Sequence, residues 1–128
     1  MKPGLTHSED LTHRIIGLAM RVHRSLGPGL LESVYHRCLC HELSQAGLPF
    51  DQQVPLPIRY DGIELESGYL ADIIVNGEVI LELKAVERFS PLHEAQLLTY
   101  LRLSSCLIGL LINFNTVSLT DGIRRRVL

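Results

Sequence analysis

Residues 69–86 read YLADIIVNGEVILELKAV, and this stretch decides the fold that we expect for the chain. Two runs of mostly Ile, Val and Leu flank an Asn-Gly pair, which is typical of the tight turn in a β-hairpin. The first run carries Asp72, and the second carries Glu82 and Lys84. Charged side chains within such apolar strands need a structural or functional reason.

The turn decides on which face of the hairpin Asp72 lies. Glu82 and Lys84 are two residues apart, so they share one face, with Cα atoms about 6.6 Å apart. A two-residue type I′ loop pairs Asp72 with Leu81 and places it on the opposite face, among aliphatic side chains.

A three-residue loop over residues 75–77, with a left-handed Gly77 and a bulge, instead pairs Asp72 with Ile80. A lone carboxylate among aliphatic side chains costs on the order of several kcal/mol or takes up a proton. We therefore predict the three-residue loop. It brings Asp72 to the face of Glu82 and Lys84, and it leaves an apolar face made of Ile73, Val79, Leu81 and Leu83.

Two carboxylates on adjacent strands can hold Mg²⁺ or Mn²⁺ through hard oxygen ligands and leave positions open for water and phosphate. A nearby lysine can orient the water or offset the charge of a phosphoryl transition state. The alternative interpretation is structural: Glu82 and Lys84 form a cross-strand salt bridge, and Asp72 belongs to a turn.

The bulk composition indicates one globular domain over residues 1–128. The chain is 46% hydrophobic and 20% charged, and its net charge of -2 supplies no overall field for nucleic acid. Nucleic-acid binding would therefore need a local patch. Three cysteines and an N-terminus without an apolar core lead us to expect a cytoplasmic protein. The most apolar run, residues 106–112, is too short to span a membrane.

Periodicity predicts two helices before the hairpin. The first follows a stripe over residues 11–26, with Thr6 or Ser8 as its N-cap, and ends at a Gly-Pro-Gly sequence. The second covers residues 30–46. Its predicted buried residues are Leu31, Val34, Cys38, Leu39 and Leu43.

The remaining elements are mostly strands. Residues 54–60 alternate and contain two prolines, which predicts an edge strand, and residues 63–68 lead up to the hairpin. Ser90 and Pro91 begin a helix over residues 91–103, and residues 107–114 form a buried strand. Residues 122–128 add a last short strand. The order ααβββαβ(β) predicts an α/β (α+β) domain, a mixed sheet flanked by helices.

Two other clusters of polar residues are possible binding sites. Cys38 and Cys40 lie about 200° apart on a helix, so together with His36 and His41 they do not form a zinc site. The only basic run, residues 124–126, could grip phosphate, but alternation splits its side chains between two faces, which favours a solvated surface.

The chain resembles the GxxExxYE family of the PD-(D/E)XK nuclease superfamily, whose signature is an acid, a variable gap and then acid-x-lysine. The resemblance extends from about Ile15 to the C-terminus. The segments that carry it are GLLESVY at 29–35, YLAD at 69–72, ELK at 82–84, EAQLLTYL at 94–101 and GLLINF at 109–114. Two positions depart from the pattern: His36 stands in place of a second Glu, and Leu70 stands where a basic residue is frequent.

The resemblance implies a restriction-endonuclease-like core and a role for each matching residue. Asp72 and Glu82 correspond to the metal-binding acids, and Lys84 corresponds to the catalytic lysine. Glu32 corresponds to an acid on the first core helix. Gln96 and Tyr100 correspond to polar positions that line the site. The alternative for Glu32 is a favourable interaction with the helix dipole. Gln96 and Tyr100 could instead be ordinary residues at the border of the core. Tyr35 could be an ordinary core residue.

These implications lead us to expect a Mg²⁺- or Mn²⁺-dependent phosphodiesterase that acts on DNA or RNA, without membrane association. A homodimer is an option that the sequence leaves open. The alternative function is a non-catalytic module on the same fold that binds nucleic acid or protein.

Overall fold

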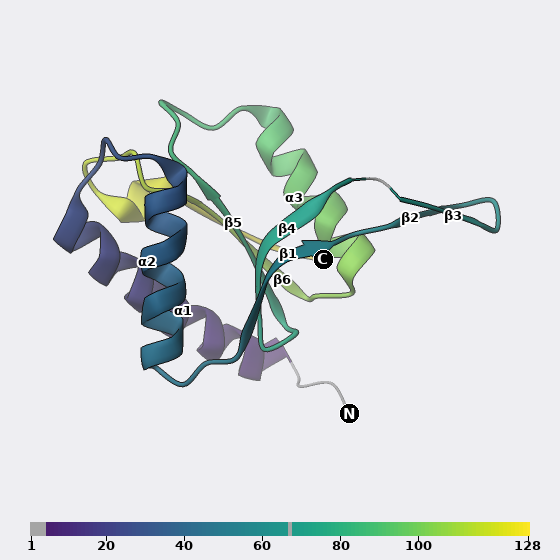
Figure 1. Cartoon of the computed structure of the whole chain (residues 1–128), viewed down its shortest axis with the longest axis horizontal. Helices are drawn as coiled ribbons and strands as arrows, with labels where there is room; N and C mark the ends of the chain where they lie inside the picture. Colours follow the sequence, from purple (N-terminus) through teal and green to yellow (C-terminus); the bar gives the residue numbers. More distant parts are fainter. Residues whose placement is uncertain (1–4, 67) are drawn as a thin grey trace.

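The computed structural model describes residues 5–66 and 68–128 (Figure 1). Its helices are α1 (Leu5–Leu26), α2 (Glu32–Gln45) and α3 (Pro91–Ser104), with a 3-10 turn η1 at Leu119–Gly122. Its strands are β1 (Phe50–Pro55), β2 (Ile58–Tyr60), β3 (Ile63–Leu65), β4 (Leu70–Val75), β5 (Val79–Lys84), β6 (Ile108–Asn113) and β7 (Ile123–Val127). No helix in the described ranges is long and apolar enough to cross a membrane.

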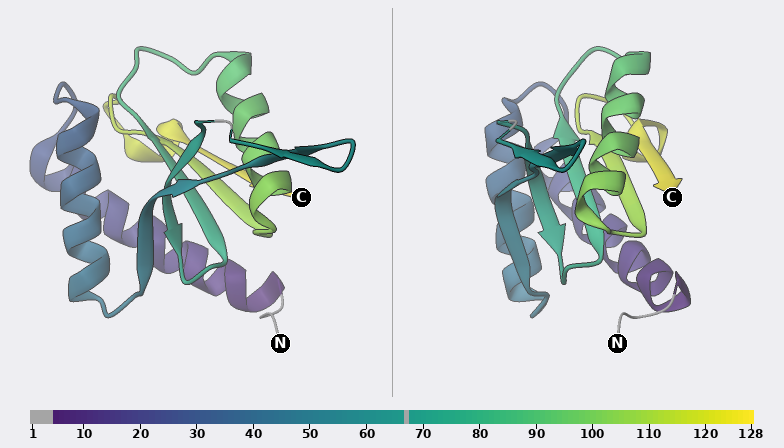
Figure 2. Two further views of the ribbon diagram at one scale, coloured as in Figure 1. Left: turned by 45° about the vertical axis from the view of Figure 1, so that its right-hand side comes forward. Right: turned by 90° about the vertical axis from the view of Figure 1, so that its right-hand side faces the viewer.

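Five strands form one mixed sheet in the order β1-β4-β5-β6-β7. β5 and β6 run parallel because α3 connects them, and the other neighbouring strands are antiparallel. α1 and α2 cover one face of the sheet and α3 covers the other (Figure 2). The predicted class, a single α+β domain with a mixed sheet flanked by helices, is confirmed.

The central hairpin contributes to a separate core on each face of the sheet. Its predicted apolar face is confirmed, because Ile73, Val79, Leu81 and Leu83 are fully buried in the core that contains α1 and α2. On the other face, Ile74 and Ile80 pack in the core that contains α3. Burial on both sides fixes which residues of β5 face which helix layer.

The start of α1 differs from the prediction. Thr6 and Ser8 lie inside the helix and do not cap it, because α1 already includes Leu5. Ser8 is buried, and its Oγ donates a hydrogen bond to Glu78 Oε2 at 3.0 Å, in the turn between β4 and β5. This contact ties the first turns of α1 to the hairpin.

The buried face of α2 is rotated relative to the prediction. Leu31 precedes the helix in an extended conformation and is 74% exposed, so its predicted burial is wrong. Val34 and Cys38 are half-buried and face the space between α1 and α2. The stripe that packs on the sheet includes Tyr35, Leu39 and Leu43, as predicted for Leu39 and Leu43. The reason is that α2 begins only at Glu32, so the residue before it is outside the helical period.

An edge strand is present, but it covers Phe50–Pro55 rather than the predicted residues 54–60. β1 lies at the sheet edge, as predicted, but it ends at Pro55, and residues 58–60 leave the sheet. There, β2 pairs with β3 to form a two-stranded arm that projects beyond α3 in Figure 1. Pro55 and Pro57 lack the N–H groups that a continuous strand would need, which explains the break.

The three arginines of β7 alternate between the faces, as predicted. The Arg124 guanidinium lies 5.3 Å from the centre of the Phe89 ring, and Arg126 forms an ion pair with Glu94 of α3. Arg125 points the other way and pairs with Glu9 of α1 at 2.6 Å. Each of the three therefore interacts within the protein.

Candidate active site

The turn of the central hairpin has a three-residue loop, but not the loop that the sequence predicts. Val75 pairs with Val79, so the loop consists of Asn76, Gly77 and Glu78. Asn76 and Gly77 both have positive φ, 53° and 66°, and Glu78 N donates to Val75 O at 2.9 Å. These features describe a type I′ turn followed by one extra residue. The left-handed Gly77 is confirmed, and the bulge lies at the next position.

The pairing of Asp72 with Ile80 is therefore wrong, because Ile80 pairs with Ile74. Continuing the observed register by one pair beyond Ile73 and Leu81 brings Asp72 opposite Glu82. The shift has a tertiary cause: the buried Glu78 carboxylate accepts hydrogen bonds from Ser8 Oγ and from Asn76 Nδ2, which keep Glu78 in the loop. Since the shift is two residues, every side chain keeps its predicted face.

The carboxylates of Asp72 and Glu82 are both held by backbone N–H groups of the hairpin. Asp72 N donates to Glu82 Oε2 at 2.8 Å, and Leu83 N donates to Asp72 Oδ2 at 2.8 Å. The carboxylates thus replace the backbone carbonyls that would otherwise accept the next hydrogen bonds between β4 and β5. Within the described residues, the second oxygen of each carboxylate accepts no hydrogen bond. The site therefore offers two fixed, adjacent carboxylates, each with an oxygen still available for a ligand.

Lys84 is the half-buried last residue of β5, and its backbone is fixed by β6. Lys84 O accepts from Phe114 N at 2.9 Å, and Lys84 lies beside Asn113 in the parallel register. Two residues on, Val86 N donates to Asn113 Oδ1 at 3.0 Å, and Val86 O accepts from Asn113 Nδ2 at 2.8 Å. This clamp holds the chain just beyond the lysine. The sequence predicted no role for Asn113, although its polarity at the end of an apolar strand was a signal.

Glu32 is placed at the site by the loop between α1 and α2. Tyr35 is fully buried and stacks on Phe114 with ring centres 4.6 Å apart. Its hydroxyl donates to Gly27 O at 2.6 Å and accepts from Leu30 N at 3.1 Å, which fixes the chain where α2 begins. Tyr35 is thus a core residue with a structural hydrogen-bonding role.

The carboxyl of Glu32 interacts electrostatically with the hairpin acids. Partial burial and the charge of Asp72 raise the pKa of Glu32, whereas Lys84 and His36 act in the opposite direction. Glu32 and Asp72 line the same cavity of about 480 Å³, together with Ser33, His36, Arg37, Gln52 and Gln53.

His36 belongs to this cavity, although the sequence analysis assigned it no role in the site. Its Nε2 lies 2.9 Å from Gln52 Oε1 of β1, and its charge when protonated would lower the pKa values of Asp72 and Glu32. His36 follows Glu32 by four residues, so both lie on one side of α2. That spacing was the signal that could have placed it here.

Gln53 has a strained backbone beside the hairpin acids. Its φ is 49°, a left-handed value that costs a non-glycine residue about 1–2 kcal/mol. Its neighbours Gln52 and Val54 pair with Ile73 and Ala71, so Gln53 lies where β1 passes Asp72. The strain allows the strand to bend around the cavity. Nothing in the sequence indicates it.

Tyr100 reaches the other side of the acid pair from α3. It is 4% exposed, and its ring centre lies 6.1 Å from that of Tyr69. Burial raises the pKa of Tyr100, followed by the charges of Glu82 and Asp72. Gln96 is half-buried one turn earlier on α3, and it forms no side-chain hydrogen bond with another residue in the described ranges. The structure thus brings Tyr100 to the acids, whereas no contact of Gln96 with them is observed in the described ranges.

The two hairpin acids repel each other, and burial shields both of them from water. Burial raises the pKa of Glu82 to about 8, and the charge of Asp72 contributes to the same effect. Burial also raises the pKa of Asp72, against the hydrogen bond from Leu83 N and the charge of Lys84. A buried pair with raised pKa values either shares a proton or binds a cation.

A sequence model of the PD-(D/E)XK nuclease superfamily matches residues 9–126, nearly the whole chain. This chain belongs to that superfamily. No curated protein and no solved structure gives a significant match. The order of elements and the mixed five-stranded sheet are consistent with the restriction-endonuclease-like fold expected for a PD-(D/E)XK protein.

PD-(D/E)XK nucleases typically use divalent metal ions, and the donor set here fits such an ion. Asp72 and Glu82 offer two free carboxylate oxygens, which are hard ligands, and a bound cation would relieve their mutual repulsion. In the described ranges, no group of three or more His, Cys, Asp or Glu side chains is arranged to hold an ion. Water and substrate oxygens would have to complete the coordination of Mg²⁺ or Mn²⁺.

Proposed function

We propose that this PD-(D/E)XK protein is a divalent-metal-dependent phosphodiesterase that cuts DNA or RNA. The observation that supports it most directly is that backbone N–H groups of the hairpin hold the carboxylates of Asp72 and Glu82, with Lys84 two residues further along β5. If Asp72 and Glu82 had only a structural role, we would expect them to form a surface salt bridge with Lys84. Here neither acid forms an ion pair with Lys84 in the described ranges, and one oxygen of each acid remains available.

In this proposal each residue has one task. Asp72 and Glu82 bind Mg²⁺ or Mn²⁺, which would polarise the scissile phosphate and lower the pKa of a bound water. Lys84 orients the attacking water and offsets negative charge on the phosphorane-like transition state. Glu32 accepts a hydrogen bond from that water, because its carboxyl faces Asp72 and Lys84 from the start of α2. Tyr100 and Gln96 contact the substrate from α3.

We further assign the chain to the GxxExxYE family within the superfamily. The tyrosine of that motif, Tyr35, anchors the loop that presents Glu32, which gives the spacing of the motif a physical reason. His36 stands in place of the second glutamate and lies at the same cavity, and it adds an imidazole to the site. Leu70 is 41% exposed beside the acids, so it leaves an apolar contact where a basic residue would bind phosphate.

We place the activity in the cytoplasm, because the three cysteines are free thiols. The exposed apolar face of the β2–β3 arm, with Tyr60, Ile63 and Leu65 each at least 45% exposed, is compatible with a homodimer.

The test is a cleavage screen over single- and double-stranded DNA and RNA with Mg²⁺, Mn²⁺ or EDTA. We expect metal-dependent cleavage of at least one substrate. Lys84→Ala should lower the rate by about 10²–10³-fold, because it removes charge stabilisation of the transition state. Asp72→Ala should remove both cleavage and metal binding. Arg88→Ala serves as a matched control that removes a cation four residues away.

Each variant needs an unfolding curve, so that lost activity is not mistaken for lost structure. If the wild-type protein binds an oligonucleotide but cuts none of the four substrates with either metal, the enzymatic proposal fails. The non-catalytic binding module would then be the better description.

A further inference from the structure

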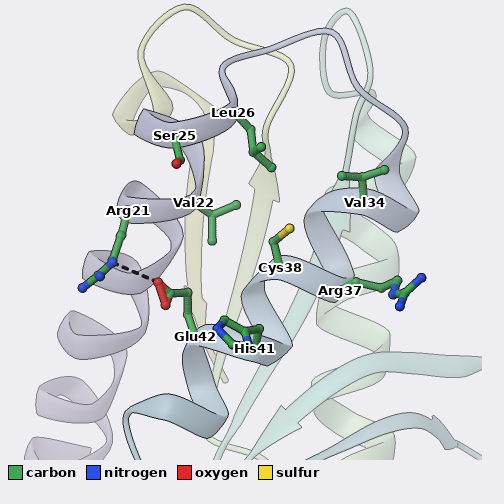
Figure 3. A pocket seen from close by; sticks show the side chains of 9 residues that line it. All are labelled: Arg21, Val22, Ser25, Leu26, Val34, Arg37, Cys38, His41 and Glu42. Carbon is green, nitrogen blue, oxygen red and sulfur yellow. Dashed lines mark ion pairs between the residues drawn. The ribbon is translucent and has the colours of Figure 1, made fainter.

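A second cavity lies between α1 and α2, outside the acid site (Figure 3). Its volume is about 630 Å³, within the usual range for a small-molecule or nucleotide site. Val22 and Leu26 of α1 and Val34 and Cys38 of α2 form an apolar floor, as their side chains point into the space between the helices. The cavity is thus an apolar cleft that opens on the surface.

The rim of this cleft is polar. Arg21 and Glu42 form an ion pair at 2.9 Å on one side, and so neutralise each other. Arg37 lies on the opposite side, where its side chain points outward from α2, and His41 and Ser25 complete the rim (Figure 3). Arg37 forms no ion pair with any residue that the structure describes, and it is exposed. Its guanidinium therefore supplies a positive charge available to a ligand.

Arg37 also connects the cleft to the proposed active site. It lines both this cleft and the cavity that contains Glu32 and Asp72. Along α2 the rise from Glu32 to Arg37 is about 7.5 Å, and to His41 it is about 13.5 Å. One strand of stacked nucleic acid rises about 3.4 Å per nucleotide. The cleft therefore lies within roughly two to four nucleotides of the bond that the site would cut.

We propose that this cleft binds an unpaired nucleotide of the substrate strand, next to the position of cleavage. The apolar floor contacts the face of the base, His41 and Ser25 reach its polar edge, and Arg37 binds its phosphate. A base in a duplex presents only its edges, so this site requires a nucleotide that is unstacked or single-stranded. The proposal rests on the nuclease function and names its substrate class: a strand with an unpaired segment.

Charge and position favour this occupant over a peptide. An unpaired arginine that lines both cavities can contact a phosphate backbone as it leaves the acid site. The protein carries a net charge of -2, so such binding needs a local cation of this kind. A peptide would have no reason to be continuous with the carboxylate pair.

Cys38 provides a reporter that does not depend on activity. It is the half-buried thiol on the floor of the cleft, whereas Cys40 and Cys106 are buried at 8% and 3% exposure. Burial also raises the pKa of the Cys40 thiol to about 11, so little reactive thiolate forms there at neutral pH. A methanethiosulfonate reagent should therefore modify Cys38 first. The Cys38→Ser variant, which should lose this fast phase, verifies the assignment.

The experiment uses full-length protein with Asp72→Asn in EDTA, so that binding is separated from cleavage. The probes are a single-stranded oligonucleotide of about 12 nucleotides and a duplex of the same sequence. We expect saturating single strand to slow modification of Cys38 by at least about fivefold and the duplex to leave it nearly unchanged. Arg37→Glu should weaken single-strand binding by about tenfold and reduce its salt dependence, whereas Arg102→Glu, on α3, should not.

The possible results separate this inference from the nuclease proposal. Single-strand binding without protection of Cys38, no binding at all, or normal binding by Arg37→Glu each overturns the nucleotide site, even if the wild type cleaves. Equal protection by the duplex overturns the requirement for an unpaired nucleotide. Protection by an acidic peptide but not by the oligonucleotide assigns the cleft to a protein partner instead. Protection and binding without cleavage by the wild type would uphold the site and overturn the nuclease.

Discussion

Asp72 and Glu82 each accept a hydrogen bond from a backbone N–H of the opposite strand: Glu82 Oε2 accepts from Asp72 N, and Asp72 Oδ2 accepts from Leu83 N, both at 2.8 Å. The two carboxylates are therefore held by main-chain groups of the hairpin rather than by flexible partners. Preorganised ligands of this kind lose little conformational entropy when an ion binds. The same bonds keep two like charges close together, which contributes to the raised pKa of Glu82.

The first prediction concerns the stability of the metal-free protein. The pKa of Glu82 is about 8 in the folded protein and 4.5 in the reference state. Between these values the folded state keeps a proton that the unfolded state has lost, so stability falls as the pH rises from about 4.5 to about 8. Glu82→Gln should remove this loss and be more stable by about 1–2 kcal/mol at pH 8.

Urea unfolding at several pH values in EDTA measures this effect. Wild type and Glu82→Gln should differ little near pH 4 and diverge as the pH rises. Glu64→Gln, on the exposed β3 strand, is the matched control and should follow the wild type. Parallel pH profiles for wild type and Glu82→Gln would contradict the raised pKa.

The second prediction concerns the protons released on metal binding. A metal ion bound between Asp72 and Glu82 requires both carboxylates to be ionised, so it must displace the proton that the high pKa retains. Titration calorimetry with Mn²⁺ at pH 7, in buffers of different ionisation enthalpy, should show release of about one proton. The apparent affinity should increase with pH up to about 8 and then level off. Binding that releases no proton would place the ion elsewhere.

The third prediction uses the strained residue of β1. Gln53 has a φ of 49°, which glycine adopts without steric cost, so Gln53→Gly should stabilise the fold by about 0.5–1 kcal/mol. Gln52→Gly is the paired control, because Gln52 pairs regularly with Ile73 and contacts His36. It should destabilise the protein by about 1 kcal/mol. Thermal unfolding of both variants distinguishes the two effects, and equal shifts would argue against local strain.

The fourth prediction concerns the close packing beside the Asn113 clamp. A Cβ at Gly122 would overlap with Asn113 O, so Gly122→Ala must displace the backbone at Asn113, the residue of β6 that pairs with Lys84. We expect a loss of about 1–3 kcal/mol. Gly17→Ala, in open space on α1, should instead stabilise by about 0.5–1 kcal/mol. Denaturant midpoints measure both. A neutral Gly122→Ala would show that this loop is looser than described.

Much of the fold follows from the sequence because its signals are local. The alternation of β4 and β5 predicts which residues are buried, and a change of register by two residues leaves that prediction intact. Ser90 caps α3 as predicted, with Pro91 in the first turn. The acid-x-lysine spacing likewise fixes that Glu82 and Lys84 share a face, whatever the rest of the chain does.

The details of the candidate site depend on contacts between distant segments. The register of the hairpin is set by Glu78, which is held by Ser8 from 70 residues earlier. His36 joins the acids only because α2 packs beside β1, and Asn113 clamps Val86 only because β6 lies parallel to β5. Local periodicity cannot encode such partners.

The sequence by itself therefore determined that two carboxylates and a lysine share one face of an apolar hairpin. Only the tertiary structure decided how they are arranged, because burial of both sheet faces removes water from the acids and leaves main-chain N–H groups as their partners. It also decided that Val34 and Cys38 line a cleft between α1 and α2, since that depends on how the two helices pack.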